Sequence, residues 1–241
     1  VTGTLNMADL TVKVAELPAE DTALIRVGAV LLLLVFAIKA AVLPLHFWLP
    51  ATYANAPMPV AALFAIMTKV GAYAIIRVYT MIFPPDLLVT SGLHDLWLLP
   101  AALVSLVIGA LGVLAAKELN RLIAFSVIGS MGMVMVAIAL FSADGIAAAL
   151  YYIIHSTLAA GALFLIADLV RAGRANLNLT AQPPIAGARL TMALFFVAAI
   201  AMTGLPPLSG FIGKLLILDA GFDTPTMAWI WALILGASLV N

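Results

Sequence analysis

The feature that most constrains this chain is a series of apolar runs of about 20 residues or more, long enough to cross a hydrocarbon core of about 30 Å. Hydrophobic residues make up 65% of the 241 residues and charged residues only 9%, too few charges for the surface of a soluble domain. No series of alternating strands of about 10 residues is visible, which argues against a β-barrel. The sequence predicts an all-α, polytopic transmembrane helix bundle. The expected spans are residues 23–47, 58–83, 96–116, 121–141, 145–170, 190–218 and 226–241.

The two ends of the sequence suggest an internal piece of a longer protein. It does not begin with Met, and it stops inside the apolar run "WIWALILGASLVN". Residues 1–22 are mixed in polarity and predict a loop or an interfacial segment.

Several classes of function are disfavoured by composition. The chain has no cysteine, which excludes disulfides and cysteine-ligated iron–sulfur centres from it. Its net charge is zero and no block of like charges occurs, so nothing indicates nucleic acid as a partner. We expect no cofactor and no metal site.

The charged residues between the spans sort onto two sides if successive connectors alternate across the bilayer. One side receives Lys117, Arg121, Arg171, Arg174 and Arg189. The other receives Asp86, Asp95, Asp144, Asp219 and Asp223, with Lys13, Arg26 and Arg77 as its basic residues. Because cytoplasmic loops carry an excess of Lys and Arg, we expect the first side to face the cytoplasm of a bacterial inner membrane.

Lys69 is the ionisable residue that lies deepest in an expected span. Charged groups at such depth cost about 2.5–3.5 kcal/mol on insertion scales and mark functional sites by default. Its side chain is too short to reach the interface from mid-span, more than about 10 Å away at 1.5 Å per residue. We therefore predict a polar path or a buried pair at Lys69.

Lys39 lies five residues before Pro44, near the end of the first span. Proline removes a backbone donor and frees the carbonyl four residues earlier. Exposed backbone at membrane depth is tolerated only within protein or beside a water-filled cavity. Lys39 and a helix break at Pro44 are therefore expected to share such a cavity, although snorkelling of this lysine is an alternative.

Lys214 repeats this arrangement, because it follows a cluster of helix-breaking residues inside an apolar span. Discontinuous helices near the bilayer midplane form ion sites in transporters. The expected breakers are Gly204, Pro206, Pro207, Gly210 and Gly213.

His155 lies mid-span and can gain and lose a proton near neutral pH, although a buried histidine is as often a packing residue. Tyr152, Ser156 and Thr157 are possible partners, whereas His46 and His94 are expected at the interface. No Asp or Glu lies deep in a span. Because burial disfavours an unpaired charge, we expect the buried lysines to exchange protons through water and histidine. A permanent carboxylate partner would have to come from outside this sequence.

Four segments resemble the antiporter-like membrane subunits. This superfamily includes the D subunit of the Mrp (Pha, Mnh) multisubunit sodium or potassium/proton antiporters and the proton-pumping subunits of respiratory complex I. The segments are "KAAVLPLHFWLP", "AP" followed by "PVAALFAIMTKVGAYAIIRVYTMIF", "ELNRLIAFSVIGSMG" and "LPPLSGFIGKLLIL".

The resemblance implies two inverted repeats of five helices, each with a discontinuous helix and a proton half-channel. Lys39 and Lys214 would be the lysines of the two discontinuous helices, Lys69 that of the next helix, and His155 the central histidine. Residues 23–95 would hold the end of the first repeat and residues 96–241 most of the second. Partners would be other membrane subunits of the complex, the lipid bilayer, monovalent cations and protons.

Two departures bear on the choice within the superfamily. Ala51-Thr52-Tyr53 stands where complex I subunits usually have Asp-Ala-His, which favours the D subunit of the antiporter. "LAAGALF" after His155 lacks the lysine of many relatives, so His155 would act through water. The leading hypothesis is a subunit of a cation/proton antiporter, not an enzyme. The alternatives are a proton-pumping subunit of a redox complex, such as complex I or a membrane-bound hydrogenase, and a structural membrane scaffold.

Overall fold

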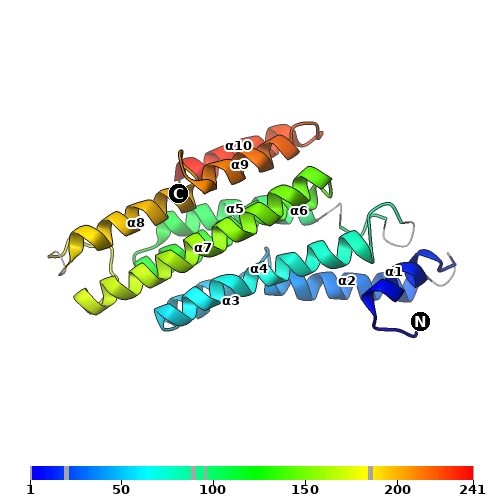
Figure 1. Cartoon of the computed structure of the whole chain (residues 1–241), viewed down its shortest axis with the longest axis horizontal. Helices are drawn as coiled ribbons and strands as arrows, with labels where there is room; N and C mark the ends of the chain where they lie inside the picture. The colour runs from blue at the N-terminus through cyan, green and yellow to red at the C-terminus, as the bar shows by residue number, and fades with distance from the viewer. Residues whose placement is uncertain (1, 19–21, 88–90, 95–96, 184–186, 241) are drawn as a thin grey trace.

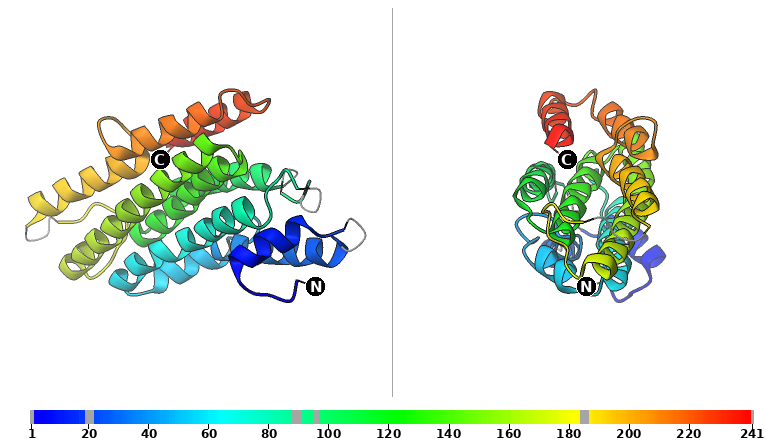
Figure 2. Two further views of the ribbon diagram at one scale, coloured as in Figure 1. Left: turned by 45° about the vertical axis from the view of Figure 1, so that its right-hand side comes forward. Right: turned by 90° about the vertical axis from the view of Figure 1, so that its left-hand side faces the viewer.

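The computed structural model describes residues 2–18, 22–87, 91–94, 97–183 and 187–240. Within them the chain forms ten helices, which run along one common direction as an elongated bundle (Figures 1 and 2). The helices are α1 Met7–Ala15, α2 Thr22–Lys39, α3 Trp48–Asn55, α4 Met58–Met81, α5 Leu98–Ala115, α6 Leu119–Ala139, α7 Ala143–Arg174, α8 Ala188–Thr203, α9 Ser209–Ala220 and α10 Met227–Val240.

Five of these helices are long and apolar enough to cross a membrane, namely α2, α4, α5, α6 and α7. Two shorter apolar helices, α8 and α10, accompany them. The outer surface is apolar as well: Leu158 is 70% exposed, Leu63 69% and Phe196 65%. Such a surface is stable against lipid or another apolar protein surface, and not against water. The predicted all-α transmembrane bundle is confirmed.

Helix α6 forms the centre of the bundle and contacts α3, α4, α5, α7 and α9. Its crossing with α5 is close because glycines face each other there: a Cβ added at Gly109 would lie 2.5 Å from Cα of Gly129. Small residues allow this approach, which supplies the van der Waals contact that holds helices together in lipid.

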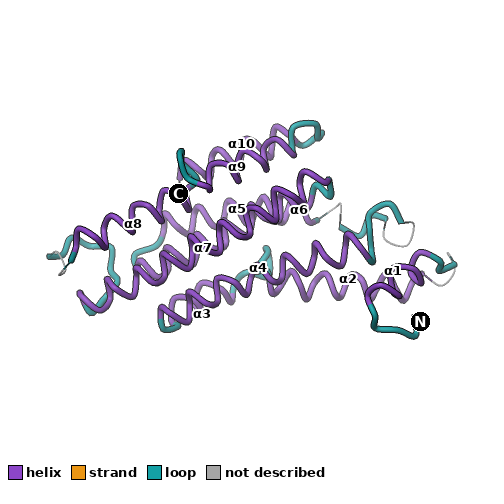
Figure 3. Tube along the Cα trace, in the orientation of Figure 1, coloured by secondary structure: helices purple, strands orange, loops and turns teal. Residues whose placement is uncertain are grey.

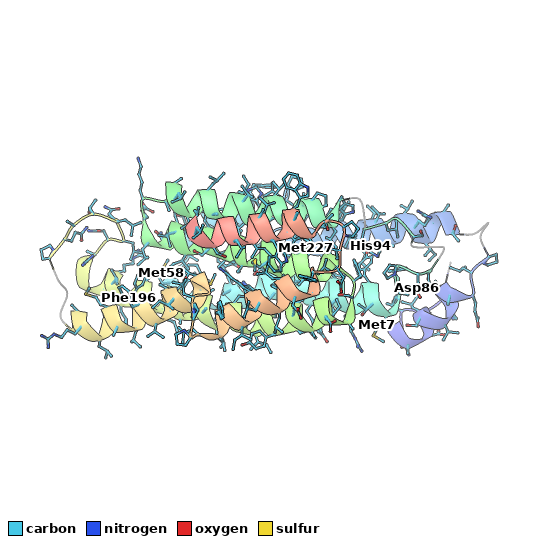
Figure 4. All side chains as sticks on the ribbon, turned by 90° about the horizontal axis from the view of Figure 1, so that it is seen from above. Met7, Met58, Asp86, His94, Phe196 and Met227 are labelled. Carbon is cyan, nitrogen blue, oxygen red and sulfur yellow. The ribbon has the colours of Figure 1, made fainter. Side chains whose placement is uncertain are left out.

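Hydrogen bonds show which connectors meet at each end of the bundle. At one end, Arg26 on α2 donates to the Ser91 carbonyl in the α4–α5 connector (3.1 Å). At the other end, the backbone N–H of Leu119 donates to the Leu177 carbonyl (2.8 Å), so the α5–α6 and α7–α8 connectors lie together. Figure 4 places Asp86 and Met7 at the first end, with Phe196 toward the second.

The predicted sorting of charges follows from this arrangement. The connectors and helix ends that carry Lys117, Arg121, Arg171, Arg174 and Arg189 are at the second end. Those that carry Asp86, Asp144, Asp219 and Asp223 are at the first end. Asp95 lies outside the described residues, as do residues 96 and 241, which bound two of the predicted spans.

The bundle contains two discontinuous helices, each formed by two helical segments with a loop between them. The pair α2 and α3 is separated by residues 40–47, and the pair α8 and α9 by residues 204–208. Figure 3 shows both breaks as loop segments between the two ends of the bundle. The first pair runs from the Asp-rich end to the basic end and the second runs the opposite way, as inverted repeats require (Figure 1).

Met7–Ala15, inside the segment predicted to be a loop or interfacial, is helical, and its start is capped by the Asn6 side chain. The structure corrects two predicted boundaries. The first span does not end at residue 47, because α3 continues it to Asn55 beyond the break. Helix α7 begins at Ala143, two residues earlier than expected, because the Ser142 hydroxyl caps it by accepting from the Gly145 N–H (3.0 Å).

Candidate functional site

Lys69 lies in the middle of α4 and points into the bundle, with 2% of the residue exposed. Its Nζ donates to the Ser130 hydroxyl on α6 across 3.3 Å. The Ser130 hydroxyl in turn donates to the Val127 carbonyl one turn earlier on the same helix (2.7 Å). The predicted burial of Lys69 is confirmed, and its partner is a neutral hydroxyl.

Lys214 is held by the break between α8 and α9. Helix α8 ends at Thr203 because Gly204 adopts a left-handed conformation with φ 72°. Nζ of Lys214 donates to the Thr203 carbonyl and to the Ser238 hydroxyl on α10, the latter across 2.6 Å. The last carbonyls of a helix lack intrahelical partners. The ammonium therefore satisfies a backbone acceptor that the break has exposed.

The breakers predicted before Lys214 divide into two groups. Pro206 and Pro207 lie in the loop with Gly204, as expected, but Gly210 is the second residue of α9 and does not break a helix. A Cβ on Gly210 would lie 2.8 Å from Nε2 of His155 and 3.0 Å from Cα of Gly204. Gly210 is therefore required for close packing of α9 against α7 and the break. Gly213 is also within α9 and packs against Tyr152.

A cavity of about 60 Å³ lies between α5, α6, α7, α8, α9 and α10. Apolar side chains such as Leu106 and Phe195 form part of its wall. Its polar lining includes Ser130, which binds Lys69. It also includes Lys214 and both partners of Lys214, which are Thr203 and Ser238. The polar residues are Ser126, Ser130, Tyr152, Thr203, Lys214 and Ser238.

His155 is 7% exposed on α7, and its Nδ1 lies 2.9 Å from the Ser209 hydroxyl at the start of α9. The predicted hydroxyl partners are wrong, because Ser156 and Thr157 both donate to the Ile153 carbonyl of their own helix. Tyr152 contacts the imidazole edge-on, with ring centroids 5.4 Å apart.

The imidazole of His155 does not line the 60 Å³ cavity. With Ser209 it lines an apolar groove of about 480 Å³ between α7 and α8. Its Nε2 is buried and makes no hydrogen bond within the described residues, and Ala201 at the end of α8 lines the same groove. The histidine therefore contacts both sides of the second break.

Lys39 is the last residue of α2 and lies at the first break, as the sequence predicted. It is exposed on the side of the bundle and makes no hydrogen bond or ion pair within the described residues. Its side chain therefore shares no hydrogen-bond partner with Lys69 or Lys214, while its backbone packs against Gly71 on α4.

Pro44 lies in the loop of the first break, as expected. The freed backbone is held by neighbouring side chains: the Leu43 N–H donates to the Ser105 hydroxyl on α5 (2.9 Å), and Trp48 donates to the Ile38 carbonyl (3.0 Å). These bonds satisfy backbone groups that lipid cannot satisfy.

The two remaining histidines differ from each other. His46 is half-buried, whereas His94 is 1% exposed. The ring of His94 lies with its centroid 4.2 Å from that of Phe141 and 6.1 Å from that of Tyr79. Aromatic residues of α4 and of the α6–α7 connector thus cover a histidine that the sequence places near a span end.

Carboxylates are not partners of the buried lysines in the described part of the chain. The ion pairs there join Lys13 to Asp9 (3.1 Å) and Arg121 to Glu118 (3.7 Å), and both lie near helix ends. Within the described residues, no group of three or more His, Cys, Asp or Glu side chains could hold a metal ion.

The sequence alone did not identify four serines that contact the breaks or the lysines: Ser105, Ser130, Ser209 and Ser238. Serine is common at helix–helix contacts in membranes, so its presence in a span carries little information by itself. The available signal was spacing, because Ser126 and Ser130 lie one turn apart on one face of α6.

The geometry defines a class: an integral membrane protein with two discontinuous helices and two buried amines, one held at a helix break and the other by a hydroxyl of a neighbouring helix. A family model, "NADH:quinone oxidoreductase/Mrp antiporter, TM", matches residues 1–240. The chain belongs to this family. It is 43% identical over 229 residues to the D subunit of the Na(+)/H(+) antiporter of Bacillus subtilis (strain 168), covering 92% of this chain and 44% of that protein. It thus spans less than half the length of this curated relative.

Solved structures show the same fold. The Mrp complex from Dietzia sp. DQ12-45-1b matches with a TM-score of 0.82 and 29% identity, over 99% of this chain and 43% of the matching one. Respiratory complex I from Thermus thermophilus with bound NADH matches with a TM-score of 0.84 and 28% identity, over 99% and 49%. The predicted family resemblance is confirmed, and it extends to both branches of the family.

Proposed function

We propose that this chain is part of the D subunit of a multisubunit Na⁺ (or K⁺)/H⁺ antiporter, in which buried amines move protons across the membrane. The observation that carries the proposal is the placement of Lys69 and Lys214 inside a lipid-embedded bundle, with neutral oxygens as their partners. Intramembrane ionisable groups of this kind mark proton and ion pathways. The relative at 43% identity is itself the D subunit of a Na(+)/H(+) antiporter, which supports the same assignment.

The two buried lysines have the roles of proton carriers in this proposal. Their partners are hydroxyls and a carbonyl, so a lysine that loses its proton leaves no buried carboxylate unpaired. The cavity beside Lys214 supplies room for water, through which a proton can move between groups that do not touch. Moving a proton needs no bond other than N–H and O–H bonds to form or break.

Lys39 and His155 have supporting roles at the two breaks. Lys39 is exposed beside the first break, where a segment that packs over α2 would bury it and supply the missing acidic partner. His155 joins α7 to the start of α9 through Ser209, so its protonation is coupled to the geometry of the second break. Other membrane subunits would cover the apolar outer surface, and the exchanged solutes would be protons and monovalent cations.

The basic end of the bundle is proposed to face the cytoplasm of the bacterial cell membrane. Its connectors carry Lys117, Arg121, Arg171, Arg174 and Arg189, and a Lys and Arg excess marks cytoplasmic loops. The chain has no cysteine, so Asn176→Cys would create a single labelling site in this chain. A membrane-impermeant maleimide should label this cysteine in inverted vesicles. It should not label it in cells whose outer envelope is permeable but whose inner membrane is intact, and the reverse pattern would refute the orientation.

The test of the function uses Lys69→Ala and Lys214→Ala in the complete complex, reconstituted in proteoliposomes. A sodium gradient should drive proton movement in the wild type, and each variant should lose at least about nine-tenths of it while the subunits still copurify. Wild-type flux in either variant would refute the proposal. Intact flux accompanied by poor assembly would favour a structural scaffold.

A proton-pumping subunit of a redox complex is the second candidate, because the fold matches complex I with a TM-score of 0.84. The same lysines would then move protons, driven by electron transfer in other subunits. Deletion of the gene separates the two. Sensitivity to sodium at alkaline pH supports the antiporter, whereas loss of NADH oxidation with normal salt tolerance supports the redox complex.

A further inference from the structure

Ser130 joins Lys69 to the cavity beside Lys214. On one side its hydroxyl accepts a hydrogen bond from Nζ of Lys69 (3.3 Å). On the other side Ser130 lines the cavity that Lys214, Thr203 and Ser238 also line. Lys69 itself does not line that cavity, so Ser130 separates its ammonium from the space beside Lys214.

The cavity can hold water that completes the connection. A volume of about 60 Å³ exceeds the roughly 10–15 Å³ that a site for one water requires. Buried waters need two to four polar partners. The hydroxyls of Ser126, Ser130 and Ser238 on two different helices supply partners, with the ammonium of Lys214 among them.

A serine hydroxyl has the hydrogen-bonding capacity that a relay requires. It carries one donor and two acceptor lone pairs, so it can receive a proton on one lone pair while releasing its own. In the structure the Ser130 hydroxyl donates to the Val127 carbonyl at 2.7 Å. Rotation about its side-chain bond would turn that donor toward the cavity without moving the helix.

We propose that Ser130 is a proton-relay residue that connects Lys69, through the water-sized cavity between α6 and α10, to Lys214. This inference rests on the proposed proton movement and names the group through which the two lysines communicate. His155 is not needed for this connection, because its ring lines the α7–α8 groove and not the cavity that Ser130 and Lys214 line.

The transfer conserves protons at each step. An N–H bond of the Lys69 ammonium breaks as an O–H bond forms at Oγ of Ser130, and the original hydroxyl proton passes to a cavity water. That water gives a proton to the neutral amine of Lys214, which becomes the ammonium that binds Thr203 and Ser238. The net result is one proton moved from Lys69 to Lys214, with Ser130 and the water unchanged.

The experiment measures sodium-driven proton flux for Ser130→Ala and Ser130→Thr in proteoliposomes that contain the whole complex. Ser130→Ala should lower flux at least tenfold, because the hydroxyl is lost, and Ser130→Thr should retain most of it, because the hydroxyl remains. The matched control is Ser156→Ala, a buried serine on α7 that bonds only the Ile153 carbonyl of its own helix and touches neither lysine nor cavity. The control should leave flux unchanged.

Copurification of the other subunits and the melting temperature of each variant separate a relay from a structural role. Loss of flux in Ser130→Ala with normal assembly, restored by threonine, supports the inference. Full flux in Ser130→Ala while Lys69→Ala is inactive would overturn the relay and leave the proposed function standing. Full flux in Lys69→Ala would overturn both, and loss of flux in the threonine variant equal to that in alanine would also refute the relay.

Discussion

Replacement of Gly109 by alanine should separate helices α5 and α6 and destabilise the bundle. A Cβ at this position would lie 2.5 Å from Cα of Gly129, and its nearest neighbour is the backbone nitrogen of the same residue. Ordinary carbon–carbon contacts are about 3.5–4.0 Å, so the helices must move apart by about 1–1.5 Å. A gap of about 0.5–1 Å already forfeits a quarter to a half of the attraction between facing atoms, so this separation forfeits at least that much.

The expected magnitude follows from two opposing effects. Overpacking costs about 1–3 kcal/mol, and here the obstacle is backbone, which cannot rotate away. Alanine is a better helix former than glycine by about 1 kcal/mol, which offsets part of the cost. The net loss should be up to about 2 kcal/mol, which corresponds to a fall in melting temperature of about 4–8 °C for a chain of this size.

The matched control is Gly129→Ala, on the facing helix at the same crossing. Its Cβ would meet Cα of Gly109 at 3.8 Å, an ordinary contact. This variant should therefore melt at the wild-type temperature or slightly above it. The assay is thermal unfolding of the purified complex in detergent, followed by fluorescence. Equal melting temperatures for the two variants would refute the packing argument, because the argument depends on the asymmetry of this crossing.

Two further predictions concern the breaks. Gly204→Ala should lower the free energy of unfolding by about 1–2 kcal/mol, because alanine is strained at φ 72°. It should also reduce proton flux, because its Cβ would lie 2.6 Å from Cε of Lys214. Melting temperature and flux are the two measurements, and normal flux would show that Lys214 does not need its present position. Trp48→Phe removes the hydrogen bond to the Ile38 carbonyl and should lower the free energy of unfolding by about 1 kcal/mol. An unchanged melting temperature would mean that this bond does not stabilise the first break.

Much of the fold could be predicted because lipid restricts the choice of structure. A segment that crosses the bilayer must satisfy its own backbone, so a long apolar run is a helix. The same rule made Pro44 and the Gly204-to-Pro207 cluster visible as breaks. It failed at Gly210, because glycine serves close packing as well as breaks, and sequence does not distinguish the two uses.

The candidate site was predictable only in part. Lys69 and Lys214 were identified because a charge in an apolar run is costly and therefore rare. Their partners Ser130 and Ser238 were not, because serine is inexpensive in a membrane helix. The expected partners of His155 were wrong because they were chosen by nearness in sequence, whereas Ser209 reaches the imidazole from another helix.

The sequence by itself determined that this protein is a membrane-embedded helical bundle with two breaks and buried amines, because hydropathy, proline and charge act locally along the chain. Tertiary structure decided which oxygens hold each amine, that Lys39 is on the outer surface of the described part, and that Ser130 adjoins the cavity beside Lys214. These facts depend on how far each helix is rotated about its axis and on how closely its neighbours approach. Glycines at the crossings set that approach, and they act only when two distant segments are already packed together.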